Sequence, residues 1–223
     1  MSAGLDPVIY DGEGKRLLLL DQRALPNEVT YVSCRTSGEV AAAITDMVVR
    51  GAPAIDVSAA FGVSLGARNL AQGGGTSLKI ASFMAGLTEA CSHMKKARPT
   101  AVNLMWAVDR MYGVADALAA KGVRADEIAS GLENEAKAMF QEDVEANERI
   151  SRYGAALLPE SGTVLTHCNA GARGSRPLSC TPMISRSASY AIIWPGTSWP
   201  RAWWTAWPRR THTVPSCTRW PSV

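Results

Sequence analysis

The amino-acid sequence predicts an α/β protein, with a small antiparallel sheet and several helices in an N-terminal domain and the beginning of a second domain after it. Three observations carry this prediction. A hairpin pattern with a glycine-rich turn occupies residues 8–20. Helical periodicity fills most of residues 36–153, and a compact apolar run follows at residues 163–167. A strand directly after a long helix is typical of the first strand of an α/β domain.

The N-terminal sheet is predicted from one hairpin and one further strand. Asp11-Gly12-Glu13-Gly14 supplies the turn between the apolar runs at residues 8–10 and 16–20. Aspartate and glycine favour the backbone angles that tight turns need. Residues 29–34 form a third short strand after a loop at residues 21–28.

Five helices are expected after the sheet. The first begins at Thr36, which has capping-box spacing with Glu39. Apolar side chains continue at helical spacing to Val48, and Gly51 ends this helix. The second helix opens at Pro53, since a proline is well suited to the first helical turn. The remaining helices are predicted at residues 53–69, 77–96, 99–120 and 126–153, with Pro99 opening the fourth.

These elements divide the chain into three parts. Residues 1–155 form the sheet-and-helix domain, residues 156–172 hold the first strand and turn of the second domain, and residues 173–223 form an irregular tail. The tail contains six of the seven tryptophans, seven of the twelve prolines, seven arginines and no acidic residue. Frequent proline excludes long helices and central strands. We interpret the tail as the product of a reading-frame shift; the alternative is a real basic arm for a membrane surface or RNA.

Charge and composition narrow the function classes. Residues 1–160 carry a net charge of −4 and residues 161–223 one of +7, so the basic excess belongs to the tail. We therefore expect no nucleic-acid partner. No apolar run reaches the roughly 18–20 residues that span a bilayer, so we expect a cytoplasmic protein with no membrane partner. The five cysteines lack the paired spacing of zinc ligands or of a disulfide framework, so no metal site is expected.

Two arginines precede predicted helix starts, at Arg50-Gly51-Ala52-Pro53 and at Arg98-Pro99. The N-terminus of a helix exposes unpaired N–H groups and a partial positive charge, which attract anions. A guanidinium group beside it favours phosphate, and the small Gly51 and Ala52 allow an oxyanion to approach the backbone. The pair predicts a site for a sugar phosphate held at two points, or for one phosphate plus sugar hydroxyls; the alternative is two ordinary solvated arginines.

Cys168 is the third candidate residue. It lies in Thr166-His167-Cys168-Asn169-Ala170-Gly171, just past the predicted strand. Ligands of open α/β sheets collect at the carboxyl ends of strands, and nearby arginines would favour a thiolate. The alternative is a buried cysteine with a packing role only.

Three motifs together resemble methylthioribose-1-phosphate isomerases. They are VRGAPAI at residues 49–55, ARPTAVN at residues 97–103 and LTHCNAGA at residues 165–172, and the resemblance covers residues 8–172. It implies an N-terminal sheet-and-helix domain followed by a Rossmann-like parallel α/β domain, of which this chain holds a truncated start. It also implies a homodimer in the intact family and isomerisation of methylthioribose 1-phosphate, a step of methionine salvage, without cofactor.

The same resemblance assigns roles to individual residues. It implies that Arg50, Gly51, Ala52 and Arg98 bind substrate and that Cys168 is catalytic. Family members continue through a full α/β domain that carries a catalytic aspartate, whereas residues 173–223 contain no aspartate. We therefore expect this chain to be inactive as an isomerase.

Two other functions remain open from the sequence. A ribose-1,5-bisphosphate isomerase shares the Arg-Pro-Thr and cysteine motifs, although the Arg-Gly-Ala-Pro-Ala-Ile stretch favours methylthioribose phosphate. A regulatory subunit of the translation-initiation exchange factor would be a binding protein without catalysis. Retention of Cys168 in its Thr-His-Cys-Asn setting argues against the second.

Overall fold

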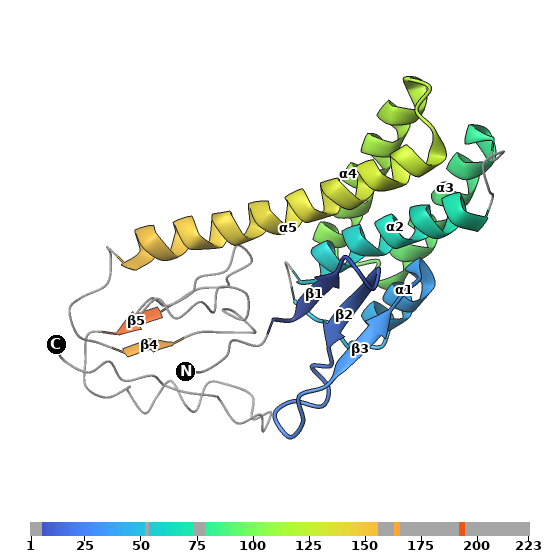
Figure 1. Cartoon of the computed structure of the whole chain (residues 1–223). Helices are drawn as coiled ribbons and strands as arrows, with labels where there is room; N and C mark the ends of the chain where they lie inside the picture. The colour runs from blue at the N-terminus through green and yellow to red at the C-terminus, as the bar shows by residue number, and fades with distance from the viewer. Residues whose placement is uncertain (1–5, 52–53, 74–78, 156–162, 166–191, 195–223) are drawn as a thin grey trace. The chain divides into compact units, whose positions relative to one another are not determined.

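The computed structural model describes residues 6–51, 54–73, 79–155, 163–165 and 192–194, as Figure 1 shows. The chain divides into two compact units, one of Leu5–Val144 and the other of Met1–Gly4 with Glu145–Val223. The first unit holds a three-stranded sheet and the helices around it. The last helix continues past Val144 into the second unit, which also holds two short strands.

The sheet of the first unit is the antiparallel meander that the hairpin pattern predicts. Its strands β1 (Val8–Asp11), β2 (Arg16–Leu20) and β3 (Tyr31–Cys34) pair in chain order. Leu17 and Leu19 on the central strand are fully buried, so one face of the sheet packs on the core. The carboxylate of Asp11 accepts hydrogen bonds from the Gly14 N–H and from Arg16 Nε, both at 2.8 Å, which fixes the turn.

Five helices follow within the described residues, as predicted. They are α1 (Ser37–Thr45), α2 (Ala54–Gly73), α3 (Ile80–Ala97), α4 (Val102–Ala120) and α5 (Ala125–Ala155). The capping box at the start of α1 is confirmed. The Glu39 N–H donates to Thr36 Oγ1 at 3.2 Å, and the Thr36 N–H donates to Glu39 Oε2 at 3.0 Å.

The prediction that the first helix continues to Val48 and ends at Gly51 is wrong, because α1 ends at Thr45. Met47 adopts a left-handed φ of 63°, which a helix cannot continue through. The two hydrogen bonds of a Schellman motif close the helix: Met47 N–H to Ile44 O at 3.3 Å and Val48 N–H to Ala43 O at 2.9 Å. Val48 and Val49 are buried although they lie after the end of α1. The apolar pattern therefore predicted their burial correctly but not their helical conformation.

Helix α2 is the centre of this unit and contacts α1, α3 and α4 as well as β1 and β2 (Figure 1). All its residues from Ala54 to Ala67 are buried. Gly62 permits the close approach of neighbouring helices, since a Cβ there would lie 2.5 Å from Met94 Cε and 3.0 Å from Val40 Cγ1. At Gly66 a Cβ would lie 3.0 Å from the Cβ of Ser37.

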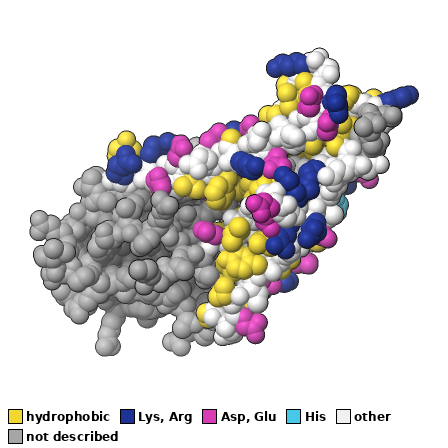
Figure 2. Space-filling model, viewed as in Figure 1, with side chains coloured by type: hydrophobic (Ala, Val, Ile, Leu, Met, Phe, Trp, Pro, Cys, Tyr) yellow, Lys and Arg dark blue, Asp and Glu magenta, His cyan; other side chains and the backbone are white. Residues whose placement is uncertain are grey.

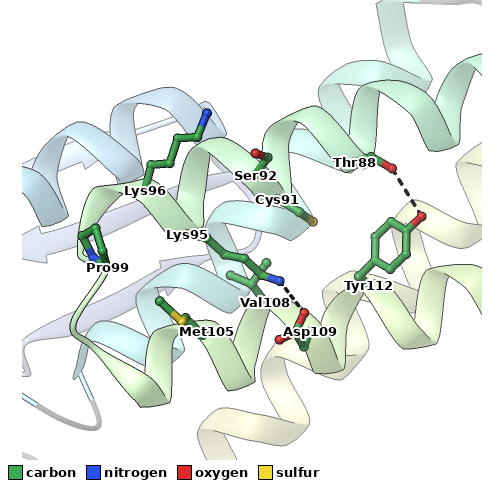
Figure 3. Close-up of a pocket in the computed structure, with 10 residues that line it drawn as sticks. All are labelled: Thr88, Cys91, Ser92, Lys95, Lys96, Pro99, Met105, Val108, Asp109 and Tyr112. Atoms are coloured by element: carbon green, nitrogen blue, oxygen red, sulfur yellow. Dashed lines mark hydrogen bonds and ion pairs between the residues drawn. The ribbon is translucent and has the colours of Figure 1, made fainter.

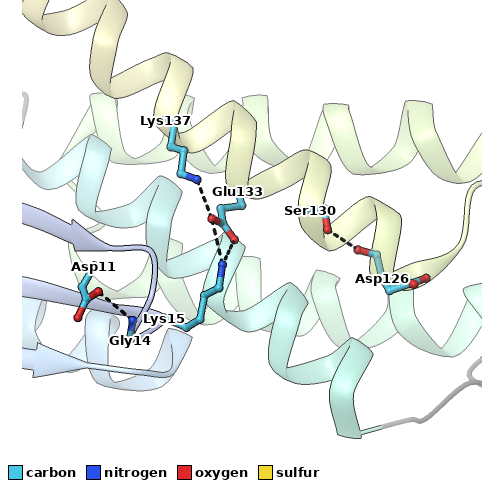
Figure 4. A network of polar contacts seen from close by, with 7 residues as sticks. All are labelled: Asp11, Gly14, Lys15, Asp126, Ser130, Glu133 and Lys137. Atoms are coloured by element: carbon cyan, nitrogen blue, oxygen red, sulfur yellow. Dashed lines mark hydrogen bonds and ion pairs between the residues drawn. The ribbon is translucent and has the colours of Figure 1, made fainter.

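A polar network ties the hairpin to α5 (Figure 4). The carboxylate of Glu133 binds Lys15 Nζ at 3.4 Å and Lys137 Nζ at 2.8 Å. Beside it, the ring of Tyr10 stacks on Phe61 with centroids 4.6 Å apart. Burial and the neighbouring Glu133 raise the pKa of Tyr10 to about 12, so the phenol stays neutral. These contacts fix the sheet against the helices.

The second unit contains a pair of short antiparallel strands, β4 (Thr163–Leu165) and β5 (Ile192–Trp194). A strand at residues 163–167 is thus confirmed over its first three residues. β5 falls in the tail that the sequence predicts to be irregular, where frequent proline excludes long helices and central strands. The Rossmann-like parallel domain and the division at residues 156–172 and 173–223 stay predictions. No helix among the described residues is long and apolar enough to span a membrane.

Candidate functional site

The turn after α1 carries the first predicted site residue, Arg50. Gln22, which follows β2, holds this turn through two backbone-directed hydrogen bonds: its N–H donates to Val48 O at 2.9 Å and its Nε2 donates to Arg50 O at 3.4 Å. Arg50 Nη2 donates in return to Gln22 O at 3.3 Å. The backbone at Arg50 is therefore fixed, while its side chain remains exposed.

Gly51 leads from this turn into α2, as the sequence predicts for a helix entrance. Its φ of 84° lies in the region that favours glycine, and its carbonyl accepts the N–H of Ile55 at 3.1 Å. Asp56 lies in the first turn of α2, where a carboxylate complements the helix dipole. Ala52 and Pro53 lie outside the described residues.

Arg98 does not directly precede a helix, although the sequence predicted that it would. It is the C-cap of α3, with φ −146° and ψ 82°, and α4 begins only at Val102 after the extended residue Ala101. The prediction that Pro99 opens the fourth helix is therefore wrong. Instead, the Arg98 carbonyl accepts the Ala101 N–H at 2.9 Å in a turn between the two helices.

The side chain of Arg98 reaches the turn that carries Arg50. Its Nη1 donates to the sulfur of Met47 at 2.8 Å, and Met47 precedes Arg50 by three residues. Next to this contact, Thr45 Oγ1 donates to the Ala97 carbonyl at 3.4 Å. The structure thus brings the two arginine segments, residues 45–51 and 97–101, together at one place on the first unit.

Both arginines keep their charge available for a ligand. Within the described part of the chain, neither Arg50 nor Arg98 forms an ion pair with a carboxylate, whereas Arg16, Arg23, Arg110 and Arg124 do. Figure 2 shows Lys and Arg side chains lying next to Asp and Glu on the face in view, so its positive charge is not gathered in one broad region. An arginine without an acidic neighbour is best placed to bind phosphate.

The remaining site predictions are not tested. Cys168 and Ala52 lie outside the described residues. Among the described residues, no group of three or more histidine, cysteine or acidic side chains is arranged to hold a metal ion. Substrate binding by Arg50, Gly51, Ala52 and Arg98, and catalysis by Cys168, therefore stay predictions.

Sequence reasoning missed a groove between α3 and α4, whose lining includes Pro99, the residue after Arg98 (Figure 3). Its lining residues are Thr88, Cys91, Ser92, Lys95, Lys96, Pro99, Met105, Val108, Asp109 and Tyr112. Lys95 Nζ contacts Asp109 Oδ1 at 2.5 Å, and Thr88 Oγ1 lies 3.3 Å from the Tyr112 hydroxyl.

Cys91 is the thiol among the residues that line this groove. It is buried, and burial raises the pKa of its thiol to about 11, so it is a poor nucleophile. The sequence identified Cys91 as a packing residue, which its burial confirms.

Residues 48–191 match the model of the initiation factor 2 subunit family, which is more than half of the chain. The chain belongs to the initiation factor 2 subunit family. The matched region includes Arg50, Gly51, Arg98 and Cys168. It extends to residue 191, whereas the resemblance based on the three sequence motifs ends at residue 172.

Several members of this family are similar in sequence. Methylthioribose-1-phosphate isomerase of Thermosipho africanus is 48% identical over 168 residues, which are 75% of this chain and 46% of that protein. A putative methylthioribose-1-phosphate isomerase of Methanocaldococcus jannaschii is 40% identical over 190 residues, covering 85% of this chain and 50% of that protein. This chain thus spans about half the length of the curated relatives it matches.

Two solved structures of family members share the fold. The crystal structure of 5-methylthioribose 1-phosphate isomerase from Pyrococcus horikoshii has a TM-score of 0.66 and 38% identity, covering 76% of this chain and 45% of that one. The translation initiation factor eIF-2B subunit delta from A. fulgidus has a TM-score of 0.64 and 34% identity, covering 76% and 46%. The family fold therefore carries both an isomerase and a translation-factor subunit.

Proposed function

We propose that this chain binds a sugar 1-phosphate through Arg50 and Arg98 and that it represents the substrate-binding part of a methylthioribose-1-phosphate isomerase. One observation carries the proposal: the Arg98 side chain contacts Met47 in the turn that leads to Arg50. Two guanidinium groups from separate helix junctions can then hold one phosphate ester. The similarity to proteins named methylthioribose-1-phosphate isomerase supports this substrate class.

The chemistry of the reaction explains why such a site is needed. An aldose–ketose isomerase moves a proton between C2 and C1 of the sugar, and a phosphate on C1 prevents ordinary opening to the free aldehyde. A general acid must assist ring opening, and another group must manage the proton or charge at C1 and C2. Bidentate guanidinium contacts fix the phosphate while this happens. We assign Cys168 as the second group, with Gly51 and Ala52 letting the ester approach the backbone.

We propose further that residues 1–223 by themselves bind the substrate without turning it over. The resemblance places the family's catalytic aspartate after the cysteine motif, and residues 173–223 contain no aspartate. Binding needs the two arginine turns only, whereas turnover needs the acid as well. The two properties can therefore be measured separately on the same protein.

The experiment is calorimetric titration of the full chain with methylthioribose 1-phosphate, followed by an assay for methylthioribulose 1-phosphate. We expect saturable binding that the double variant Arg50→Ala/Arg98→Ala loses, and no product above background. Absence of binding by the parent chain would overturn the substrate site. Product formation would overturn the proposal of inactivity while supporting the isomerase assignment.

A second candidate is a non-catalytic subunit of the translation-factor type. The similarity to the eIF-2B subunit delta at a TM-score of 0.64 favours it. Such a protein would not depend on a pentose phosphate, so a parent chain that ignores methylthioribose 1-phosphate would favour this candidate. The homodimer implied by the resemblance stays a prediction, which light scattering of the full chain tests.

The reading-frame shift after residue 172 also stays a proposal. The absence of acidic residues from 161 to 223 supports it. The family model matches as far as residue 191, so the match favours a shift that begins later than residue 172. The coding sequence downstream of the Gly171 codon decides the matter. A second frame encoding an aspartate-containing α/β domain is expected, and the lack of any such frame would rule it out.

A further inference from the structure

Met47 has a conformation that phosphate binding by the two arginines does not explain. It occupies the position after the C-cap of α1 with φ 63°, where glycine is the usual residue. Among the described residues, Lys15 is the other non-glycine residue with positive φ, and it lies in the β1–β2 turn, where such angles are ordinary. A large side chain is strained in this region, whereas a glycine is not.

The side chain at this strained position makes one contact that a glycine could not make. Its sulfur accepts the hydrogen bond from Arg98 Nη1 at 2.8 Å, across 51 residues of sequence. Met47 is 40% exposed and Arg98 is partly buried, so the contact lies at the surface where a ligand has access. The turn itself is anchored below by buried Val48 and Val49.

The chemistry of the acceptor matters for anion binding. A carboxylate in the place of Met47 would orient Arg98 but would also neutralise it and compete with phosphate for the same N–H groups. A thioether is a weak, uncharged acceptor. It can orient the guanidinium while leaving its positive charge and its other N–H donors available.

We propose that Met47 is a positioning residue: its thioether holds the Arg98 guanidinium in the orientation that binds the phosphate ester, without compensating its charge. This inference rests on the proposed function, because it takes the ligand to be a sugar phosphate. It adds a residue that sets the relative placement of the two arginine turns and does not itself touch the ligand.

Three substitutions separate the sulfur contact from the backbone strain. Met47→Leu removes the acceptor and keeps both the volume and the strain. Met47→Gln replaces the sulfur by an amide oxygen that can accept from the guanidinium. Met47→Gly removes the acceptor and relieves the strain. Met84→Leu is the matched control, because Met84 is a partly buried methionine of α3 that packs against the core.

Calorimetric titration with ribose 1-phosphate gives the first readout, with thermal unfolding alongside. Met47→Leu should weaken binding by roughly threefold to tenfold with little change in Tm, as expected for loss of one hydrogen bond. Met47→Gln should restore affinity to within about twofold of the parent chain. Met47→Gly should raise Tm and still weaken binding, a combination that a purely structural role does not produce. Met84→Leu should bind like the parent chain.

Coupling to Arg98 gives the second readout. In an Arg98→Ala background, Met47→Leu should have no further effect on binding, because the guanidinium that Met47 orients is gone. If Met47→Leu binds as the parent chain does, or if its effect persists in full without Arg98, the proposal is overturned.

A ligand-free measurement distinguishes this proposal from the proposed function. Relaxation of the Arg98 Nε–H signal in ¹⁵N NMR spectra of the full chain should show greater motion in Met47→Leu than in the parent chain and in Met47→Gln. Equal motion in all three overturns the positioning role, whatever the protein binds. Loss of order in Met47→Leu together with no ribose 1-phosphate binding by the parent chain would instead refute the sugar-phosphate function.

Discussion

The two arginine-bearing turns reach the same place by different means. Residues 48–50 are held through the backbone, since Gln22 donates to the carbonyls of Val48 and Arg50. Arg98 is the C-cap of α3, and its guanidinium is held by a side-chain contact to Met47. From the sequence, both arginines were predicted to precede a helix that a proline opens. In the structure, the Arg50–Gly51 segment leads into α2, whereas Arg98 is separated from α4 by a turn.

Because the two segments are held differently, different substitutions should affect Arg50 and Arg98. A backbone-fixed segment responds to substitutions that alter φ and ψ, and such substitutions also change the stability of the fold. A segment positioned by a side chain responds to a change of acceptor, with little effect on stability. If both guanidinium groups bind one phosphate ester, both kinds of change must weaken the same ligand.

The largest expected effect comes from removing either guanidinium. Arg50→Ala and Arg98→Ala should each weaken ribose 1-phosphate binding by about 1.5–3 kcal/mol, the range for a hydrogen bond to a charged group. Titration calorimetry measures it. The matched control is Arg35→Ala, which removes the same charge from an exposed arginine elsewhere in the unit. An equal loss in the control would mean that net charge, not this pair, attracts the ligand.

The second-largest effect is expected from a substitution in the turn that Gln22 holds through the backbone. Gly51→Ala should destabilise the protein by about 1 kcal/mol, because its φ of 84° strains any residue with a Cβ. Binding should weaken with it. Gly113→Ala is the control: it lies within α4 with no neighbouring atom within 4 Å of an added Cβ, so it should stabilise by about 0.5–1 kcal/mol. Urea unfolding checks both signs, and stabilisation by Gly51→Ala would contradict the geometry of this turn.

The smallest expected effect is a pH dependence of the free energy of unfolding, caused by Asp21, which lies next to Gln22 in the segment that holds the Arg50 turn. Hydrogen bonds from Arg23 lower the pKa of Asp21, the neighbour of Gln22, from 3.8 to about 2. A lowered folded-state pKa means that the stabilisation is complete above the unfolded value and is lost as pH falls through the folded one. The pair is exposed at Arg23, so its contribution should stay below about 1 kcal/mol.

The check is a comparison of Asp21→Asn with the parent chain. The parent should unfold at a slightly higher urea concentration near neutral pH, and the gap should close as pH falls from about 4 towards about 2. A gap that persists unchanged to the lowest pH would mean that the Asp21–Arg23 pair is not its cause.

Local patterns predicted most of the first unit, because its signals are short-range. The hairpin turn at Asp11–Gly14 and the capping box at Thr36 and Glu39 involve residues close in sequence, and both are present in the structure. The two errors fall at the site itself. Nothing in the sequence indicates that Met47 adopts a left-handed φ, so the end of α1 was misplaced.

Contacts between distant segments account for the rest of what the sequence missed. The anion-site motif predicted that Arg98 lies at the start of a helix, whereas its side chain is directed to a residue 51 positions earlier. Likewise, the groove between α3 and α4 arises from side chains such as Lys95 and Asp109 that meet only when the helices pack. Motif spacing indicates which residues carry the chemistry, and tertiary packing decides how they are oriented.

One titration tests the shared site most directly. The ¹⁵N signals of arginine side chains in the full chain can be followed while ribose 1-phosphate is added. The Nε signals of Arg50 and Arg98 should shift together and saturate with one dissociation constant, while the Arg35 signal stays unchanged. Shifts in only one of the two, or two different dissociation constants, would contradict a single phosphate site built from both turns.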